Sequence, residues 1–123
     1  MKIRPEKVAH LMRREVADII ESRLRDPRLT VTVTVTDVQV THDLSFARVF
    51  VTMMGERDLR PGGMAALKHA AGFIRRELGG RLGLREVPEV RFEYDDSLDH
   101  GQRVDLLLKK IERGESLEDE GSE

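Results

Sequence analysis

Residues 62–82 read GGMAALKHAAGFIRRELGGRL, and this stretch decides how the rest of the chain is arranged. Apolar side chains recur at helical spacing on both sides of Gly72, which predicts helix before and after this position. A glycine inside a helix costs about 1 kcal/mol relative to alanine. Its presence therefore favours a sharp turn between two short helices that meet at an angle. Four cations flank that turn: Lys68, Arg75, Arg76 and Arg81.

The chain before this stretch begins with a helix. Pro5 suits the first helical turn, where its missing N–H is no loss. An apolar stripe at three- and four-residue spacing then runs from Val8 to Leu24. Asp26-Pro27 is expected to end the helix, because the residue before a proline avoids the helical region.

Two strands are predicted after the first helix. Residues 31–40 read VTVTVTDVQV, and such alternation of apolar and polar residues is typical of a half-buried strand. The apolar phase shifts by one residue around Thr36-Asp37, which predicts a β-bulge. Turn-forming residues at 41–45 lead into a second strand at 46–54, so the two strands form a hairpin.

The last third of the chain predicts one more strand, one more helix and a tail. Apolar residues alternate with charged ones at 90–94, so a third strand buries one face. Ser97 is expected to cap a helix whose apolar stripe reaches Ile111. Residues 114–123 contain five acidic residues and no basic residue, and we expect this tail to be disordered.

The predicted order is helix, strand, strand, helix, kink, helix, strand, helix. This order indicates an α+β domain in which helices pack on one face of a three-stranded sheet. A length of 123 residues suits one domain, which we assign to residues 1–113, followed by the acidic tail at 114–123. Without the tail, 21 basic residues stand against 18 acidic ones, so the domain is mildly basic.

Composition excludes several classes of protein. The chain has no cysteine, which rules out disulfides and thiolate zinc sites. No apolar run approaches the length of a membrane span, and the N-terminus lacks the apolar segment of a signal peptide. We therefore expect a soluble, cytoplasmic protein with no membrane partner.

Motifs for catalysis or cofactor binding are missing from the sequence. It contains no P-loop, GxSxG, HExxH or dinucleotide-binding fingerprint. Asp95, Asp96, Asp99 and His100 could be drawn as an oxygen-rich metal site. Acidic residues also suit the positive end of a helix, and we prefer that interpretation. We expect no enzymatic activity, no metal, no cofactor and no small-molecule substrate.

The cations are more informative than the acids. Arginine accounts for 16 of the 21 basic residues, and residues 57–91 carry eight bases against four acids. Guanidinium groups pair well with phosphates, whereas four Phe, one Tyr and no Trp are too few for base stacking to dominate. Binding of structured RNA through phosphates and shape fits best.

Candidate RNA contacts follow from this charge distribution. The first group surrounds the predicted kink: Lys68, Ala70, Gly72, Arg75, Arg76, Arg81 and Arg85. The second group lies on the first helix, after its end and on the hairpin: Arg4, Lys7, Arg13, Arg14, Arg28 and Arg48.

Five stretches of the sequence form a characteristic series: DPRL at 26–29, VQVTHDLSFARVFV at 38–51, AAGFIRREL at 70–78, REVPEVRF at 85–92 and DDSL at 95–98. In this order and spacing they resemble the bacterial ribosome-binding factor A family. The resemblance implies a type II KH-like fold in which an Ala-x-Gly kink, here Ala70 and Gly72, replaces the GxxG clamp of RNA-binding KH domains. The chain's own GxxG pattern at 80–83 precedes a strand, so we expect it to be a helix C-cap.

The same resemblance implies a function. It suggests a monomeric, non-enzymatic assembly factor that binds the free small (30S) ribosomal subunit and its 16S rRNA. Such a factor supports late maturation of the subunit and processing of the 16S rRNA 5′ end, notably during cold adaptation.

Two other functions stay open at this point. One is a generic KH-type RNA-binding module with a non-ribosomal target. The other is a protein-interaction domain that uses the edge of its sheet. A metal-dependent hydrolase ranks third, because the sequence shows no convergent catalytic groups.

Overall fold

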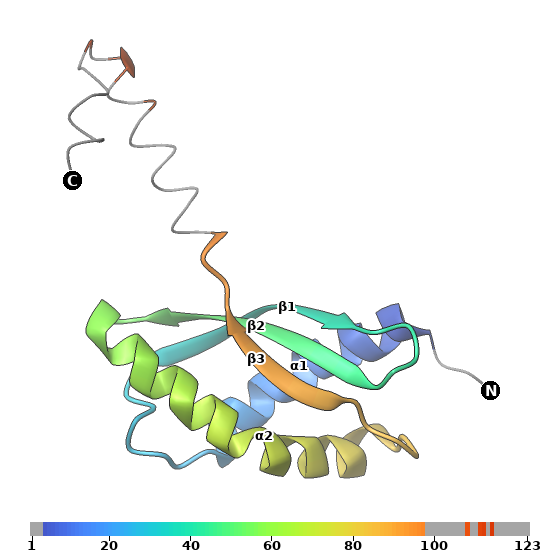
Figure 1. Cartoon of the computed structure of the whole chain (residues 1–123). Helices are drawn as coiled ribbons and strands as arrows, with labels where there is room; N and C mark the ends of the chain where they lie inside the picture. Colours follow the sequence, from blue (N-terminus) through green and yellow to red (C-terminus); the bar gives the residue numbers. More distant parts are fainter. Residues whose placement is uncertain (1–3, 98–107, 109–110, 113, 115–123) are drawn as a thin grey trace.

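The computed structural model describes residues 4–97, 108, 111–112 and 114, and its chain path is shown in Figure 1. The elements of this described part are, in chain order, α1 (Pro5–Arg23), β1 (Thr32–Val40), β2 (Phe46–Met54), the 3-10 helix η1 (Arg57–Leu59), α2 (Arg60–Leu82) and β3 (Glu89–Tyr94). The predicted α+β class is confirmed. The predicted last helix and the acidic tail lie almost entirely outside the described residues.

Helix α1 forms as the apolar stripe predicts. Its buried side chains recur every three or four residues: Val8, Met12, Val16, Ile19 and Ile20. The helix ends at Arg23, slightly before the predicted stop at Asp26-Pro27, and Leu24 already has extended backbone with φ −84° and ψ 136°. Residues 24–31 form a connection that runs past α2 to β1 and contains a turn at Pro27–Arg28, where the N–H of Leu29 donates to the Asp26 carbonyl oxygen at 2.9 Å.

Strands β1 and β2 form the predicted hairpin, including its bulge. The register shifts between Val35, which pairs with Val51, and Asp37, which pairs with Phe50. Thr36 is thus the extra residue, and its Oγ1 donates to Asp95 Oδ2 over 2.6 Å. The bulge keeps one face of β1 apolar on both sides of the phase change.

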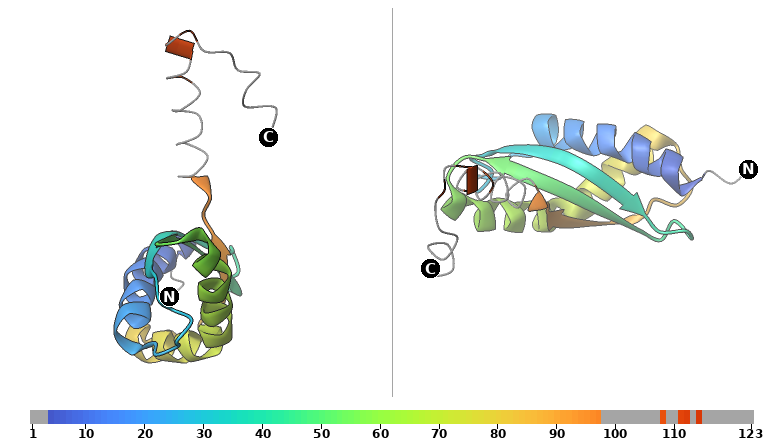
Figure 2. Two further views of the ribbon diagram at one scale, coloured as in Figure 1. Left: turned by 90° about the vertical axis from the view of Figure 1, so that its left-hand side faces the viewer. Right: turned by 90° about the horizontal axis from the view of Figure 1, so that it is seen from above.

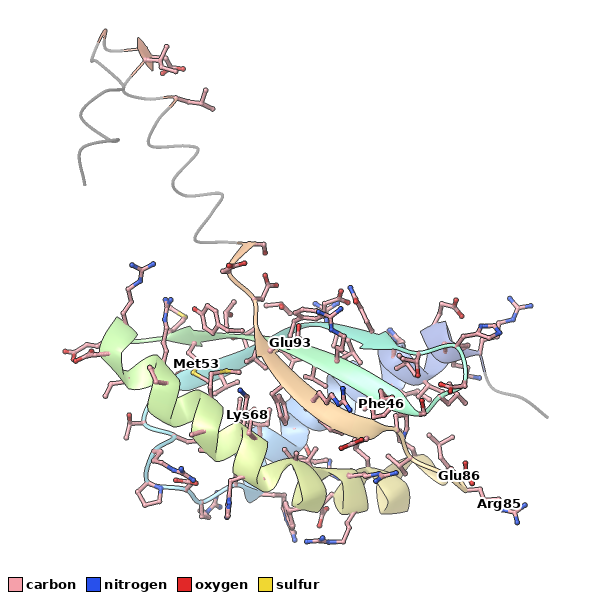
Figure 3. All side chains as sticks on the ribbon, viewed as in Figure 1. Phe46, Met53, Lys68, Arg85, Glu86 and Glu93 are labelled. Atoms are coloured by element: carbon pink, nitrogen blue, oxygen red, sulfur yellow. The ribbon has the colours of Figure 1, made fainter. Side chains whose placement is uncertain are left out.

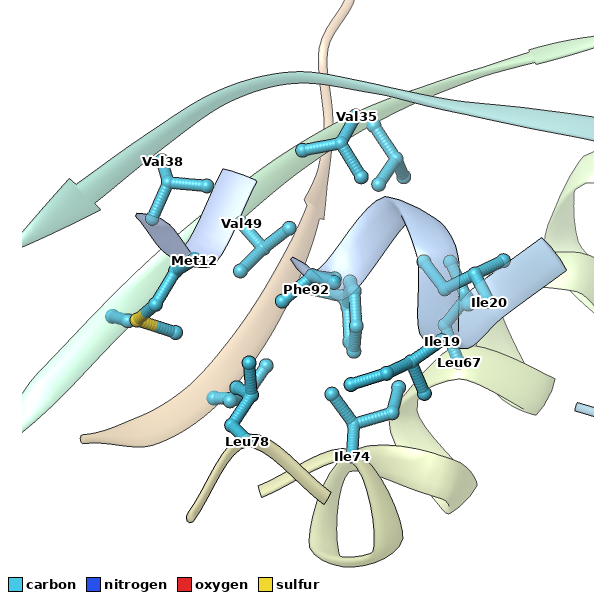
Figure 4. Packing of buried hydrophobic residues seen from close by; sticks show 14 of the residues in the cluster. Met12, Ile19, Ile20, Val35, Val38, Val49, Leu67, Ile74, Leu78 and Phe92 are labelled. Atoms are coloured by element: carbon cyan, nitrogen blue, oxygen red, sulfur yellow. The ribbon is translucent and has the colours of Figure 1, made fainter. Parts of the chain in front are cut away.

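Strand β3 completes a sheet of order β1-β2-β3, and it runs parallel to β2 from the Phe46–Glu89 pair to the Val51–Tyr94 pair. Both helices pack on the same face of this sheet (Figure 2). The core between the layers includes Val49 of β2 and Phe92 of β3, in contact with side chains from both helices (Figure 4).

Helix α2 corrects one prediction. The structure has a single helix from Arg60 to Leu82, not two short helices separated at Gly72. Gly72 keeps helical backbone, and the uninterrupted helix changes direction near its middle (Figure 1). A curved helix can follow the core without losing its hydrogen bonds.

The end of α2 is set by a glycine, as expected from the GxxG pattern. Gly83 has φ +64° and ψ 21°, the left-handed conformation of a helix C-cap. Gly80, the first glycine of the pattern, still lies within the helix.

Candidate nucleic-acid interface

A groove runs between the connection after α1 and the middle of α2. We call it the arginine groove; its volume is about 620 Å³. Eleven residues line it: Arg23, Leu24, Arg25, Asp26, Pro27, Arg28, His69, Ala70, Gly72, Phe73 and Arg76. Four arginines and a histidine therefore share one groove with a single carboxylate.

The two residues of the Ala-x-Gly motif both lie in this groove. Ala70 and Gly72 are part of its α2 wall, and Gly72 carries no side chain there. A Cβ at Gly72 would have only Arg76 Nη1 within 4 Å, at 3.9 Å. The small residues thus leave the helix backbone accessible between flanking cations, as close approach of a ligand requires.

The opposite wall is shaped by the Asp26-Pro27 turn. The Asp26 carboxylate accepts hydrogen bonds from the backbone N of Arg28 at 2.9 Å and from its Nη2 at 2.7 Å. The side-chain hydrogen bond from Arg28 is the main reason why the pKa of Asp26 falls from its ordinary 3.8 to about 2. The Asp26 carboxylate therefore holds Arg28 in place and neutralises part of its positive charge.

Other cations of the groove are less constrained. Arg25 donates to the carbonyl oxygen of Leu24 at 3.1 Å, while Arg23 makes a long ion pair of 3.4 Å with Glu77. Arg25 and Arg76 form no ion pair with any residue in the described part of the chain. Their guanidinium groups are the ones best placed to donate hydrogen bonds to a phosphate.

A second hollow continues from Arg76 toward the loop before β3. Arg75, Arg76 and Arg85 line it, together with the acidic residues Asp43 and Glu86. Arg75 Nε donates to the carbonyl oxygen of Val87 at 3.0 Å, and Arg85 and Glu86 lie at the tip of the loop (Figure 3). Arg76 belongs to both hollows and connects them.

Arg81 is placed differently from the other kink cations. Its Nη1 lies 3.0 Å from Glu15 Oε2 and 2.5 Å from Asp18 Oδ2, both on α1, and its Nε lies 3.8 Å from Glu77 Oε2. Its hydrogen bonds with Asp18 and Glu15 raise the pKa of Arg81. This side chain, 26% exposed, joins α1 to α2 and is not part of the arginine groove.

The remaining candidates are dispersed over the surface. Arg4, Lys7, Arg13 and Arg14 are exposed at or on α1, and Arg13 lines a different hollow beside β1. Arg48 is on the open face of the sheet, where its Nη2 lies 2.6 Å from Glu93 Oε2. Lys68 faces β3 rather than the groove (Figure 3).

The structure therefore brings together only part of the predicted set. Ala70, Gly72, Arg76 and Arg28 share the groove, which adds Arg23, Arg25 and His69 to them. The spacing Arg23-x-Arg25-x-x-Arg28 is visible in the sequence, but its proximity to α2 depends on how the connection crosses the helix.

Within the described residues, no group of three His, Asp or Glu side chains is arranged to hold a metal ion. Asp95, one of the residues considered for a metal, instead accepts hydrogen bonds from Thr36 and Ser97. In the same part of the chain, none of the helices combines the length and apolarity that a membrane crossing requires.

The fold and the site together define a KH-like α+β domain with a cationic groove beside its longer helix. A family model described as ribosome-binding factor A matches residues 4–108. The chain belongs to the ribosome-binding factor A family.

Solved structures agree with this assignment. The crystal structure of ribosome-binding factor A from Thermus thermophilus is 28% identical, with a TM-score of 0.64 over 73% of this chain and 93% of that one. A homology model of the Thermus thermophilus factor, fitted into the cryo-EM map of a complex with the 30S subunit, is 30% identical. Its TM-score is 0.59 over 72% of this chain and 96% of that one.

Proposed function

We propose that this chain binds the small ribosomal subunit by placing RNA phosphates in the arginine groove. The observation that carries the proposal is that the residues of the family's Ala-x-Gly motif line the same groove as Arg23, Arg25, Arg28 and Arg76. A family relative has been fitted into the map of a 30S complex, which supports the small subunit as the partner.

The proposed role is that of a non-enzymatic, monomeric assembly factor in the cytoplasm. It binds the free 30S subunit and its 16S rRNA, and it supports late maturation and processing of the 16S rRNA 5′ end, including in the cold. Membership of the family supports this role.

The chemistry of the groove suits a phosphate backbone better than a specific base. Arg25 and Arg76 offer planar forks of N–H donors from opposite walls. Gly72 allows the RNA backbone to approach α2 closely, and Asp26 holds Arg28 at the rim. Such contacts position an RNA without reading its sequence, so affinity should depend strongly on salt.

Replacing Arg25 and Arg76 with Ala tests this proposal. Titration of 16S rRNA or small subunits at several salt concentrations should show weaker binding. The slope of log affinity against log salt should fall by about 0.7 to 0.9 for each lost phosphate contact. In a sucrose gradient of cell lysate, the parent protein should migrate with free small subunits, and the double variant should not.

Arg81→Met is the matched control, because that arginine is already paired with carboxylates of α1. It should leave the salt slope unchanged. An unchanged slope in the Arg25→Ala, Arg76→Ala variant would place the RNA elsewhere, and migration with translating ribosomes alone would contradict the proposed role.

A further inference from the structure

Strand β3 leaves one edge of the sheet open. The sheet order is β1-β2-β3, so β3 pairs with β2 on one side only. Figure 1 shows β3 running beside α2, and a groove of about 470 Å³ separates the two elements. Its walls are Lys68 and Ala71 of α2 and residues 89–93 of β3.

The direction of the free backbone groups follows from the hydrogen bonds at the two ends of β3. The N–H of Glu89 donates to Ser45 at 2.9 Å, and the N–H of Asp95 donates to Val51 at 2.8 Å. In a parallel ladder, every second residue points both its N–H and its C=O at the same neighbour. Residues 90, 92 and 94 therefore point theirs away from β2, toward the open edge, and residues 90 and 92 line the groove.

The two edges of the sheet differ in how well they are protected against pairing with a further strand. The β1 edge is interrupted by the bulge at Thr36, and bulges are a common way to prevent further strand pairing. The β3 register has no such shift over its six residues, and the strand contains no proline. It is a regular template for an additional strand.

We propose that, on the small subunit, an extended segment of a subunit protein adds to the β3 edge as a fourth strand. Residues 90, 92 and 94 present alternating donors and acceptors at the two-residue repeat of a β-strand. Another polypeptide strand offers a donor and an acceptor at each step of this repeat, whereas the phosphates of RNA supply acceptors only and cannot pair with the free C=O groups. The open space next to Ala71 leaves room for the incoming chain.

Lys68 makes this docking surface favour an added strand with an acidic residue. The residue is exposed, and no residue in the described part of the chain forms an ion pair with it. Its charge does reach Glu93, whose pKa is lowered first by the hydrogen bond from Arg48 and also by the nearby Lys68 ammonium group. An acidic side chain on the added strand would meet this ammonium group across the groove. The recognised segment is therefore an extended peptide with an acidic residue on the side that faces α2.

Hydrogen exchange tests the inference, which rests on the proposed binding to the small subunit. The full chain is exchanged in D₂O alone, with protein-free 16S rRNA and with complete small subunits, then released with salt and read by NMR. We expect the amides of Val90, Phe92 and Tyr94 to exchange at least about tenfold more slowly on complete subunits, because each gains a hydrogen bond. Protein-free 16S rRNA should not slow them.

Several results would overturn the inference, and they differ from failure of the proposed function. Unchanged exchange at these amides in subunit-bound protein excludes strand addition, while equal slowing by protein-free 16S rRNA identifies RNA as the occupant. Slowing in the chain alone that grows with its concentration identifies a second copy, and slowing independent of concentration identifies another segment of the chain. If the chain does not sediment with small subunits at all, the proposed function itself fails.

A steric variant gives a second measurement. Ala71→Gln places a longer side chain in the groove, and Ala65→Gln makes the same change at an exposed position of α2 outside it. Affinity for small subunits should fall about tenfold with Ala71→Gln, the loss expected from one or two hydrogen bonds. Ala65→Gln should bind like the parent, and melting curves confirm that both variants are folded. Equal affinities for both variants would argue against an occupant in this groove.

Discussion

Two glycines of α2 occupy opposite environments. Gly63 is buried against the sheet, and a Cβ there would lie 2.7 Å from Met53 Sδ. Gly72 is exposed, and a Cβ there would meet nothing closer than 3.9 Å. Close packing thus favours glycine at the first position, where the end of the buried Met53 side chain must shift to admit a Cβ, whereas stability does not require glycine at the second.

Alanine substitutions at these two glycines should therefore change the stability of the fold in opposite directions. Gly72→Ala should stabilise the fold by about 0.5 to 1 kcal/mol, the gain in helix propensity. Gly63→Ala should cost about 1 kcal/mol or more, because Met53 must move within a packed core. Chemical denaturation measures both changes. In a Met53→Ala background the cost of Gly63→Ala should disappear, and a destabilised Gly72→Ala variant would show that the curvature of α2 depends on glycine.

Asp43 organises the hairpin turn and should make stability depend on pH. Its Oδ1 accepts hydrogen bonds from the Ser45 hydroxyl at 2.6 Å and the Thr41 hydroxyl at 2.8 Å. These bonds, the one from Ser45 first, lower the pKa of Asp43 from 3.8 to about 2. A lowered pKa in the folded state means that the ionised form stabilises the fold above the unfolded pKa.

The difference in unfolding free energy between the parent and Asp43→Ala should change with pH between the ordinary pKa of 3.8 and the lowered pKa of about 2. It should be complete above about pH 5 and should shrink as pH falls through about 2, below which the carboxylate is protonated in both states. Urea titrations at several pH values measure it. Ser45→Ala removes the Ser45 hydroxyl that donates to Asp43, so the pH range over which the difference changes should become narrower. A difference that is constant across pH would contradict the stabilising role of the ionised Asp43.

At the scale of elements, α1 and α2 are joined by ion pairs as well as by the core. Arg81 of α2 reaches Glu15 and Asp18 of α1, and Arg23 of α1 reaches Glu77 of α2. These charges hold the two helices side by side next to the arginine groove. Their geometry explains why a cation predicted to bind RNA has a structural role in this fold.

Arg81→Met should lower the melting temperature, because it leaves Glu15, Asp18 and Glu77 near one another without their shared cation. The loss should be larger at low salt, since added ions screen the remaining carboxylates. Thermal melts at low and high salt test this. Arg76→Ala, in contrast, should change the melting temperature little but should reduce the dependence of RNA affinity on salt concentration.

At the scale of the whole molecule, charge is distributed unevenly along the sequence, with 21 basic and 18 acidic residues in 1–113. Residues 114–123 contain five of the 23 acidic residues and none of the 21 basic ones. Negative charge tethered to a cationic domain competes with phosphates for the same groups. This division was readable from the sequence, and its effect on binding can be measured directly.

A chain that ends at Arg113 should bind non-specific RNA more tightly than the full chain and should melt near the same temperature. Filter binding with an unrelated RNA, together with a thermal melt, measures both quantities. A version in which the five tail acids are changed to Gln is the matched control and should behave like the truncated chain. A large loss of stability on truncation would show that the tail packs on the domain.

The sequence by itself determined the elements of this protein. The apolar stripe of α1, the phase shift at Thr36 and the glycine stop at Gly83 depend on the local preferences of neighbouring residues, and the structure confirms all three. The prediction of two short helices in place of α2 was wrong, because a glycine weakens a helix without breaking it when the core holds both halves. The penalty at Gly72 is small compared with the burial of Leu67 and Ile74 on either side.

Only the tertiary structure decided which cations belong together. Arg25 and Arg76 are fifty-one positions apart yet line one groove, whereas Arg81, five positions from Arg76, is held by carboxylates of another helix. The parallel placement of β3, and with it the open edge beside Lys68, also depends on a crossover through α2. Periodicity along the chain carries no information about such contacts, because they form only when distant elements pack on the same sheet.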